Sequence, residues 1–210
     1  VHLAARPSVP RSIDDPMATH VANVEGTLAV LEAVRRAGAG ADAPYVVVAS
    51  SSSVYGANPT LPKREDLVAR PVSPYAASKL AAESYALAYG HSYGLDVLVL
   101  RFFNVFGPLQ PAGHAYAAVV PAFVDAALAG RPVTIHGDGT QTRDFTYVDT
   151  VTAVLADAVA RRVADPEPVN LAFGTRTDLL TVLERLEALL GHPVTREHVA
   201  TRPGDVPHSV

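Results

Sequence analysis

Short apolar runs alternate along the chain with longer stretches in which apolar residues recur every three or four positions. The runs of strand length are 45–50, 96–102, 133–136 and 168–173. The longer stretches, in which Leu, Val and Ala recur with helical spacing, are 18–37, 74–90, 116–130, 148–162 and 177–190. Nearly continuous apolar strands separated by helices are typical of a parallel sheet that is covered on both faces. The pattern therefore predicts an α/β fold built on a parallel sheet.

Two irregular segments interrupt this alternation. Residues 56–74 contain four prolines and show no sustained periodicity, so we expect a surface excursion between a strand and a helix. Loops of that length are often functional. Residues 107–115 form the second irregular segment, and we expect the chain to leave its first lobe there.

Composition and charge narrow the possible environments of the protein. Of 210 residues, 49% are hydrophobic and 18% are charged, and the formal net charge is −4. This small negative charge gives no electrostatic basis for binding nucleic acid or an anionic membrane. The chain has no cysteine, which excludes disulfides and thiolate metal sites and fits a reducing compartment, so we expect a cytoplasmic protein. The longest apolar runs are of strand size, so no membrane-spanning helix is predicted.

The segment 73–79 (SPYAASK) is the first candidate for chemistry. Ser73 suits a helix N-cap and Pro74 the first helical position, which places Tyr75 and Lys79 four residues apart on one face. A phenol is a base at neutral pH only if its pKa of about 10 is lowered by about three units, which requires about 4 kcal/mol from a nearby cation. The alternative is a chance Tyr and Lys on an amphipathic helix. Lysine occurs at only one other position, which favours the chemical interpretation.

Four consecutive serines, Ser50 to Ser53, follow a valine-rich strand. Ligands of open α/β sheets bind outside the carboxyl ends of the strands, so a hydroxyl there can share a proton with the tyrosine and a substrate. The alternative is a serine run that merely caps the following segment, and the serines by themselves favour that interpretation.

Two further patterns are not interpreted as sites. GHSYG (90–94) fits the nucleophile motif G-x-S-x-G, but that motif needs a strand before the serine and a helix after it, and here the order is reversed. The eight histidines show no metal-ligand spacing, and His192 and His198 lie six residues apart. No metal site is predicted.

The chain resembles the extended short-chain dehydrogenase/reductases, specifically the NAD-dependent nucleotide-sugar epimerase/dehydratase family. The motifs that carry the resemblance, in order, are VHLAA (1–5), NVEGT (23–27), SSSSVYG (50–56), YAASK (75–79), RFFNVFGP (101–108), RDFTYVDT (143–150) and RPGD (202–205). The resemblance is greatest to UDP-N-acetylglucosamine and UDP-glucose 4-epimerases. It implies an incomplete Rossmann-type doubly wound parallel sheet with a smaller interleaved substrate-binding lobe. The Rossmann portion would cover 1–106 and the lobe 107–210, with 148–173 returning to the Rossmann domain.

This resemblance implies roles for individual residues. Tyr75 would be the catalytic base, Lys79 would bind the nicotinamide ribose of NAD and lower the pKa of Tyr75, and Ser51 would be the third catalytic residue. The other implied NAD-binding residues are Leu3, Ala4, Ala5, Asn23, Ala49, Ser50 and Phe103. The implied residues for the UDP-sugar substrate are Ser8, Ser52, Ser53, Asn104, Val119, Arg143, Arg202, Asp205 and Ser209, and arginine is suited to bidentate phosphate contacts.

The reaction within the family is inferred from the serines. In the 4,6-dehydratases of the family, an Asp-Glu pair follows the catalytic Thr and eliminates water, whereas here the same places hold Ser52 and Ser53, whose hydroxyls are poor acids and bases. The resemblance thus implies 4-epimerisation through a 4-keto sugar. At Ser209, where members restricted to glucose often carry a Tyr, a small side chain implies room for an N-acetyl group. The alternatives are another reaction of the family, such as dehydration, decarboxylation or a different epimerisation, and a catalytically silent NAD- or partner-binding remnant.

The family's Gly-rich turn for the NAD pyrophosphate is not found in these 210 residues. The resemblance places that turn before the motif at 1–5, so we expect an N-terminally truncated chain. Without the turn, the pyrophosphate lacks a helix N-terminus and close backbone approach, and we expect weak NAD binding by the 210 residues alone. Helices 18–37 and 74–90 resemble the pair that forms a dimer interface in the family, which implies a homodimer.

Overall fold

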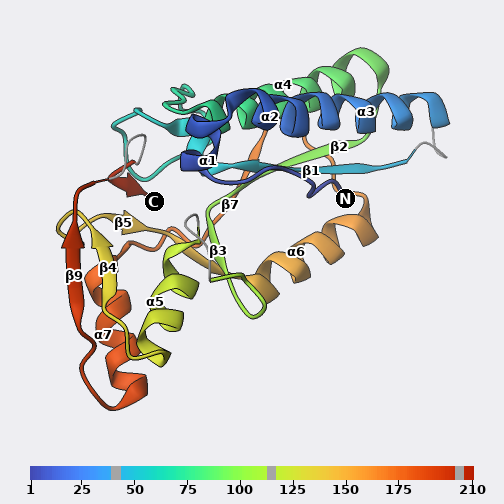
Figure 1. Ribbon diagram of the computed structural model, residues 1–210. Helices are drawn as coiled ribbons and strands as arrows, with labels where there is room; N and C mark the ends of the chain where they lie inside the picture. Colours follow the sequence, from blue (N-terminus) through green and yellow to red (C-terminus); the bar gives the residue numbers. More distant parts are fainter. Residues whose placement is uncertain (39–43, 113–116, 202–205) are drawn as a thin grey trace.

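A parallel sheet of three strands lies at the centre of the fold (Figure 1). The computed structural model describes residues 1–38, 44–112, 117–201 and 206–210. The sheet has the order β1-β2-β7, with β1 at Val46–Ser51, β2 at Val97–Phe102 and β7 at Val169–Leu171. These strands lie within the apolar runs at 45–50, 96–102 and 168–173 apart from Ser51, which extends β1 by one residue.

Helices cover both faces of this sheet. They are α3 (Gly26–Ala37), α4 (Pro74–Tyr93) and α6 (Val148–Arg161). Because side chains alternate along a strand, Val46 and Val48 pack with Leu31 of α3 and Ala86 of α4, whereas Val47 packs on the other face with residues of α6. Figure 1 shows α3 and α4 on one side of the sheet and α6 on the other. The predicted doubly wound α/β class is therefore confirmed.

The segment before β1 is mostly helical. It contains α1 (Val9–Asp14), α2 (Pro16–His20) and a π-helical turn (Val21–Glu25) that runs into α3. The helix predicted at 18–37 thus begins two residues earlier, and α1 was not predicted because its six residues are too short to show a helical period. The motif at 1–5 forms no continuous strand. Only His2 pairs with β1, through a single bridge to Val48.

A second core lies apart from the central sheet (Figure 1). It is formed by α5 (Val119–Leu128), β4 (Val133–His136), α7 (Leu179–Leu190) and β9 (Arg196–Val199), with β4 and β9 paired in parallel. Val133, Ile135 and Leu183 are fully buried in it, and Phe123 is nearly so. The helix predicted over 116–130 and the strand at 133–136 belong to this part. The proposed division into 1–106 and 107–210 stays a prediction.

Short strands join the two parts and bring the end of the chain towards the central sheet. They are β3 (Asn104–Phe106), β5 (Thr142–Arg143), β6 (Phe145–Tyr147), β8 (Thr177–Asp178) and β10 (His208–Ser209). β3 pairs with β6, and β10 pairs with β5 so that Ser209 lies opposite Arg143. Among the described residues, no helix combines the length and the apolar character needed to cross a membrane.

Candidate active site

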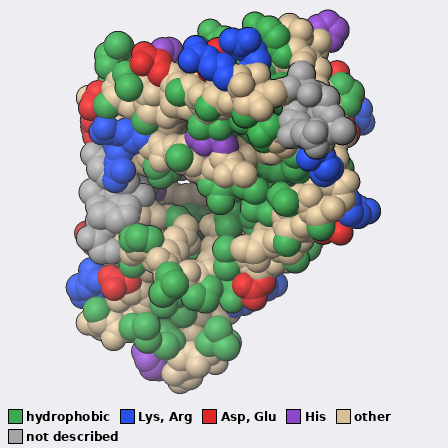
Figure 2. All heavy atoms as spheres, turned by 90° about the vertical axis from the view of Figure 1, so that its right-hand side faces the viewer, with side chains coloured by type: hydrophobic (Ala, Val, Ile, Leu, Met, Phe, Trp, Pro, Cys, Tyr) green, Lys and Arg blue, Asp and Glu red, His purple; other side chains and the backbone are tan. Residues whose placement is uncertain are grey.

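Two cavities meet where β1 and β2 end. Their volumes are about 210 and 810 Å³, and their walls share Ser51, Tyr75, Phe103, Asn104 and Arg143. The space-filling view shows the molecule hollowed between its upper and lower parts, with hydrophobic side chains gathered around the hollow (Figure 2). The carboxyl ends of parallel strands are the usual ligand-binding edge of such sheets. This arrangement identifies the shared wall as the candidate site.

The start of α4 places Tyr75 beside the serines. The Ser73 hydroxyl caps the helix by accepting a hydrogen bond from Ala76 N at 3.1 Å, and Pro74 occupies the first turn. The Ser51 hydroxyl neighbours the Tyr75 phenol in the wall that the two cavities share, and it acts to lower the pKa of that phenol. Ser51 Oγ also accepts hydrogen bonds from Ser53 N at 3.2 Å and Ser53 Oγ at 2.9 Å. The serine run therefore both caps the following 3-10 turn (Ser52–Tyr55) and contacts the tyrosine, so the two interpretations are compatible.

Lys79 lies one helical turn after Tyr75, and its Nζ donates a hydrogen bond to the carbonyl oxygen of Ala49 at 2.8 Å. Burial lowers the pKa of Lys79 to about 8. Burial raises the pKa of Tyr75, and the hydrogen bond from Ser51 opposes that rise. The predicted lowering of the Tyr75 pKa by Lys79 is therefore not found in the protein alone, where the phenol is protonated at neutral pH.

The free energy of unfolding should rise between about pH 8 and pH 10.5 because of Lys79. Its pKa is lowered from 10.5 to about 8 by folding, so in this interval the unfolded chain binds the extra proton and stability increases with pH. In Lys79→Met this contribution disappears, and wild type should gain stability relative to the variant as pH rises. Urea unfolding of both proteins across this pH interval measures the difference, and parallel pH profiles would contradict the prediction.

Most of the residues predicted to bind NAD line the larger cavity. They are Leu3, Ala5, Ala49, Ser50, Tyr75, Lys79 and Phe103. Ala4 is exposed and Asn23 is buried, and neither is part of the wall. The Asn23 side chain accepts from Arg6 N at 2.6 Å and donates to Ser78 Oγ at 2.9 Å. Asn23 therefore connects α4 with Arg6, which follows the cavity residues Leu3 and Ala5.

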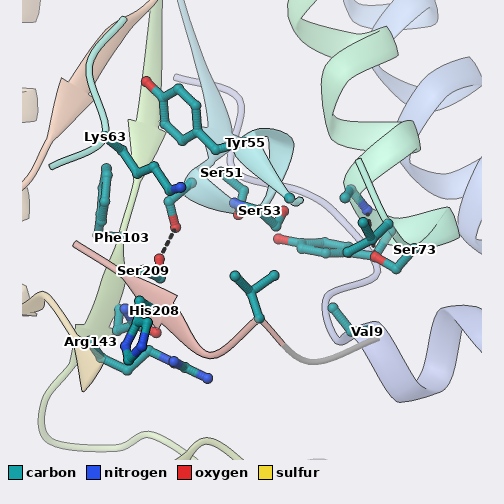
Figure 3. Close-up of a pocket in the computed structure, with 17 residues that line it drawn as sticks. Val9, Ser51, Ser53, Tyr55, Lys63, Ser73, Phe103, Arg143, His208 and Ser209 are labelled. Atoms are coloured by element: carbon teal, nitrogen blue, oxygen red, sulfur yellow. Dashed lines mark hydrogen bonds between the residues drawn. The ribbon is translucent and has the colours of Figure 1, made fainter. Parts of the chain in front are cut away.

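The predicted substrate residues divide between the two cavities. Ser8, Asn104, Val119 and Arg143 line the larger one, and Ser52, Ser53, Asn104, Arg143 and Ser209 line the smaller one. Ser52 Oγ and Ser209 Oγ form a hydrogen bond of 3.1 Å, which joins the serine run to the end of the chain. The dashed line at Ser209 in Figure 3 marks this bond. Arg202 and Asp205 lie outside the described residues.

Sequence reasoning missed several residues of the smaller cavity, notably Tyr55, Lys63 and His208. The Lys63 ammonium donates hydrogen bonds to the carbonyl oxygens of Asn58 and Thr60, and burial lowers its pKa. In Figure 3, Lys63 lies on one side of Ser209, and Arg143 and His208 lie on the other. The only available signal for Lys63 was the rarity of lysine in the chain. Lys63 and Arg143 give this wall positive charge, which favours an anionic ligand group.

The two patterns set aside from sequence lie elsewhere. Ser92 is in the last turn of α4, so no strand precedes it and no nucleophile elbow exists there. Within the described parts of the chain, no cluster of three or more His, Asp or Glu is placed to hold a metal ion.

A parallel sheet with Ser, Tyr and Lys gathered at the ends of its strands is the arrangement of a short-chain dehydrogenase/reductase. The chain belongs to the NAD dependent epimerase/dehydratase family, whose profile matches residues 1–172. The resemblance inferred from the motifs is thus confirmed, and NAD is the cofactor of the family.

Three relatives illustrate the range of that family. A UDP-glucose 4-epimerase of Mycolicibacterium smegmatis is 39% identical over 99% of this chain and 65% of the relative. A UDP-glucuronate 4-epimerase of Thermodesulfobacterium geofontis is 37% identical over 98% of this chain and 61% of the relative. The solved UDP-N-acetylglucosamine 4-epimerase from Methanobrevibacter ruminantium M1, in complex with UDP-N-acetylmuramic acid, is similar with a TM-score of 0.91 and 37% identity, covering 100% of this chain and 66% of that one. The chain thus spans somewhat less than two thirds of the length of these relatives.

Proposed function

We propose that the protein catalyses NAD-dependent 4-epimerisation of a UDP-hexose. The observation that carries this proposal is the placement of the Tyr75 and Ser51 hydroxyls together at the junction of two cavities, with the Lys79 ammonium one helical turn away. A phenol and a hydroxyl in contact provide a route by which a proton leaves or returns to a substrate alcohol. Identities of 39% and 37% to two UDP-sugar 4-epimerases support the substrate class.

In the proposed reaction, Tyr75 accepts the proton of the sugar 4-hydroxyl while Ser51 stabilises the same oxygen. The C4–H bond breaks and a 4-keto sugar forms. NAD, when bound, supplies the acceptor and later the donor of the C4 hydride. After the ketone turns over in the cavity, hydride returns to its opposite face and Tyr75 returns the proton, so no net oxidation occurs.

The described residues fit the nicotinamide side of NAD. Small side chains, Ala5, Ala49 and Ser50, line the larger cavity and leave space against the strand ends. The buried Lys79 ammonium lies at the same wall and is suited to bind ribose hydroxyls. A nearby positive charge on the bound cofactor would also favour the Tyr75 phenolate, which burial alone disfavours. Arg143 and Lys63 supply positive charge for the substrate diphosphate at the adjoining cavity.

The assay for this proposal is interconversion of UDP-glucose with UDP-galactose, and of their N-acetylated forms, by the full-length protein with NAD. Product sugars are separated by chromatography, and UDP-glucuronate is tested in parallel. The proposal predicts a C4 epimer without change in mass. A folded, NAD-binding protein that gives only a dehydrated product, or no product from any of these sugars, would contradict it.

Ser209→Tyr should reduce turnover of UDP-N-acetylglucosamine by about 10- to 100-fold and leave turnover of UDP-glucose within about threefold. The reason is that the Ser209 hydroxyl lies 3.1 Å from Ser52 Oγ at the wall of the smaller cavity, where a phenol ring would occupy the space for an N-acetyl group. Ser209→Ala is the matched control and should retain both activities. Equal loss on both substrates in Ser209→Tyr would show that Ser209 does not set this preference.

We also propose that the protein is a cytoplasmic homodimer. Met17, Val21, Tyr85 and Tyr93 are large apolar side chains exposed on α2, the π-helical turn and α4, which is the helical layer that the family resemblance assigns to a dimer interface. The absence of cysteine supports a reducing compartment. Light scattering during size-exclusion chromatography measures the oligomeric state directly.

A further inference from the structure

A row of polar side chains crosses the central sheet one residue before the candidate site. Ser50 on β1 is the register partner of Arg101 on β2, and Arg101 is in turn the partner of Asn170 on β7. Ser50 and Arg101 are almost completely buried. Ser51, which follows Ser50, contacts Tyr75. The row therefore lies one residue before Ser51, whose hydroxyl is proposed to take part in catalysis.

Glu83 of α4 binds two members of this row. Its carboxylate accepts hydrogen bonds from Arg101 Nε at 3.0 Å and Nη2 at 2.5 Å, and from Ser50 Oγ at 2.7 Å. The two charged side chains are 4% and 5% exposed, so this is a bidentate ion pair that water barely reaches. Glu83 follows Lys79 by four residues and Tyr75 by eight, which places all three on one face of the helix.

Arg101 extends the same network to the turn that contains the other serines. Its Nη1 donates to the Tyr55 hydroxyl at 2.8 Å, and that hydroxyl donates to Asn170 Oδ1 at 2.7 Å. Burial raises the pKa of Tyr55, so the hydroxyl keeps the proton that it donates. Tyr55 ends the 3-10 turn Ser52–Tyr55. One buried ion pair thus connects α4, three strands and the serine turn.

Stability does not account for a pair of this kind. A buried ion pair loses several kcal/mol of hydration per ion, and apolar residues of similar volume often replace such pairs without loss of stability. Apolar residues would make no directional hydrogen bonds. The Glu83 carboxylate, in contrast, holds Ser50 at the end of β1 in a fixed position relative to α4. The Lys79 bond to Ala49 O fixes the neighbouring residue of the same strand.

We propose that Glu83, through its ion pair with Arg101, is a positioning residue that holds the end of β1 against α4 and thereby keeps Ser51 in contact with Tyr75. The catalytic consequence rests on the proposed epimerase function, whereas the geometric consequence for β1 and α4 does not.

The test is the double variant Glu83→Leu/Arg101→Met of the full-length protein. It removes one negative and one positive charge, so the net charge is unchanged and any effect reports geometry. We expect a folded protein whose kcat for UDP-hexose epimerisation falls by about 10- to 100-fold with KM within about threefold. We also expect the Lys79 pKa, followed by the ¹³Cε signal of labelled lysine and assigned with Lys79→Arg, to rise from about 8 towards its ordinary value, because a loosened end of β1 admits water to the buried ammonium.

The matched control is Asp96→Asn/Arg162→Gln. Arg162 Nη2 and Asp96 Oδ2 form an exposed ion pair of 3.0 Å at the opposite end of β2, and its loss should change neither measurement. A folded Glu83→Leu/Arg101→Met protein with the wild-type kcat and Lys79 pKa would overturn the proposal. If wild type does not epimerise any UDP-sugar, the proposed function fails, and the Lys79 titration alone decides the positioning role.

Ser50→Ala replaces the double variant if that protein does not fold. It removes the hydroxyl through which Glu83 holds the end of β1 and leaves the Glu83–Arg101 ion pair in place. A fall in kcat by several-fold with little change in KM and a shifted Lys79 titration would support the network. Wild-type values in both measurements would overturn it.

Discussion

Tyr75→Phe should lower the kcat for UDP-hexose epimerisation by about 10³-fold, because it removes the phenolic oxygen beside Ser51 that is proposed to take the substrate proton. The aromatic ring and its packing remain, and Ser51 keeps its hydrogen bonds from Ser53. The fold and the KM for UDP-sugar should therefore change little. Circular dichroism, thermal unfolding and steady-state kinetics on the same protein sample separate loss of chemistry from loss of structure.

Tyr85→Phe is the control for the tyrosine substitution. Tyr85 belongs to the same helix but is 42% exposed and lies outside both cavities, so its variant should retain the wild-type rate. If Tyr75→Phe retained more than about one tenth of the wild-type kcat, Tyr75 would not be the base and the proton route through Ser51 would be wrong.

The sheet was predictable because its strands carry a strong and simple signal. Val46, Val47 and Val48 are apolar on both faces, as buried parallel strands require, and the helices between the strands show clear three- and four-residue spacing. Strands β3, β5, β6, β8 and β10 contain only two or three residues each and have no such signal. They form because distant segments meet, as when Ser209 comes to lie beside Arg143.

The site residues also divide into those with a local sequence signal and those that only folding brings together. Tyr75 and Lys79 were predicted from one helical turn, and Ser51 was found because family motifs placed it there. Glu83 and Arg101 carry no local signal of a shared role, since 18 residues separate them and only folding makes their ion pair. The direction of the Tyr75 pKa shift was also not predictable from the sequence. Burial raises this pKa, and the four-residue spacing between Tyr75 and Lys79 carries no information about burial.

The excursion at 56–74 was predicted as a surface loop, and the structure shows how tightly its start is held. Ala57 N donates to Arg70 O at 2.9 Å, and Arg70 N donates to Val54 O at 3.0 Å. Gly56 lies between these bonds with φ 45° and ψ −117°, a conformation that residues with a Cβ rarely adopt. The loop therefore passes back over the serine turn at Gly56, which has no side chain to obstruct the backbone of Arg70.

Gly56→Ala should lower the free energy of unfolding by more than about 3 kcal/mol, since backbone strain alone costs about 1 to 3 kcal/mol and a steric clash adds to it. A Cβ at Gly56 would lie 1.9 Å from Arg70 O, so the loop or the turn must move. Gly94→Ala is the matched control: Gly94 has φ 66° at the end of α4 with nothing within 4 Å of an added Cβ, so it should lose only about 1 to 2 kcal/mol. Urea unfolding of both variants measures the two losses. A much larger loss of unfolding free energy in Gly56→Ala than in Gly94→Ala would show that the contact with Arg70 holds the serine turn in place. Similar losses in the two variants would show that the loop moves aside at little energetic cost and does not hold the turn.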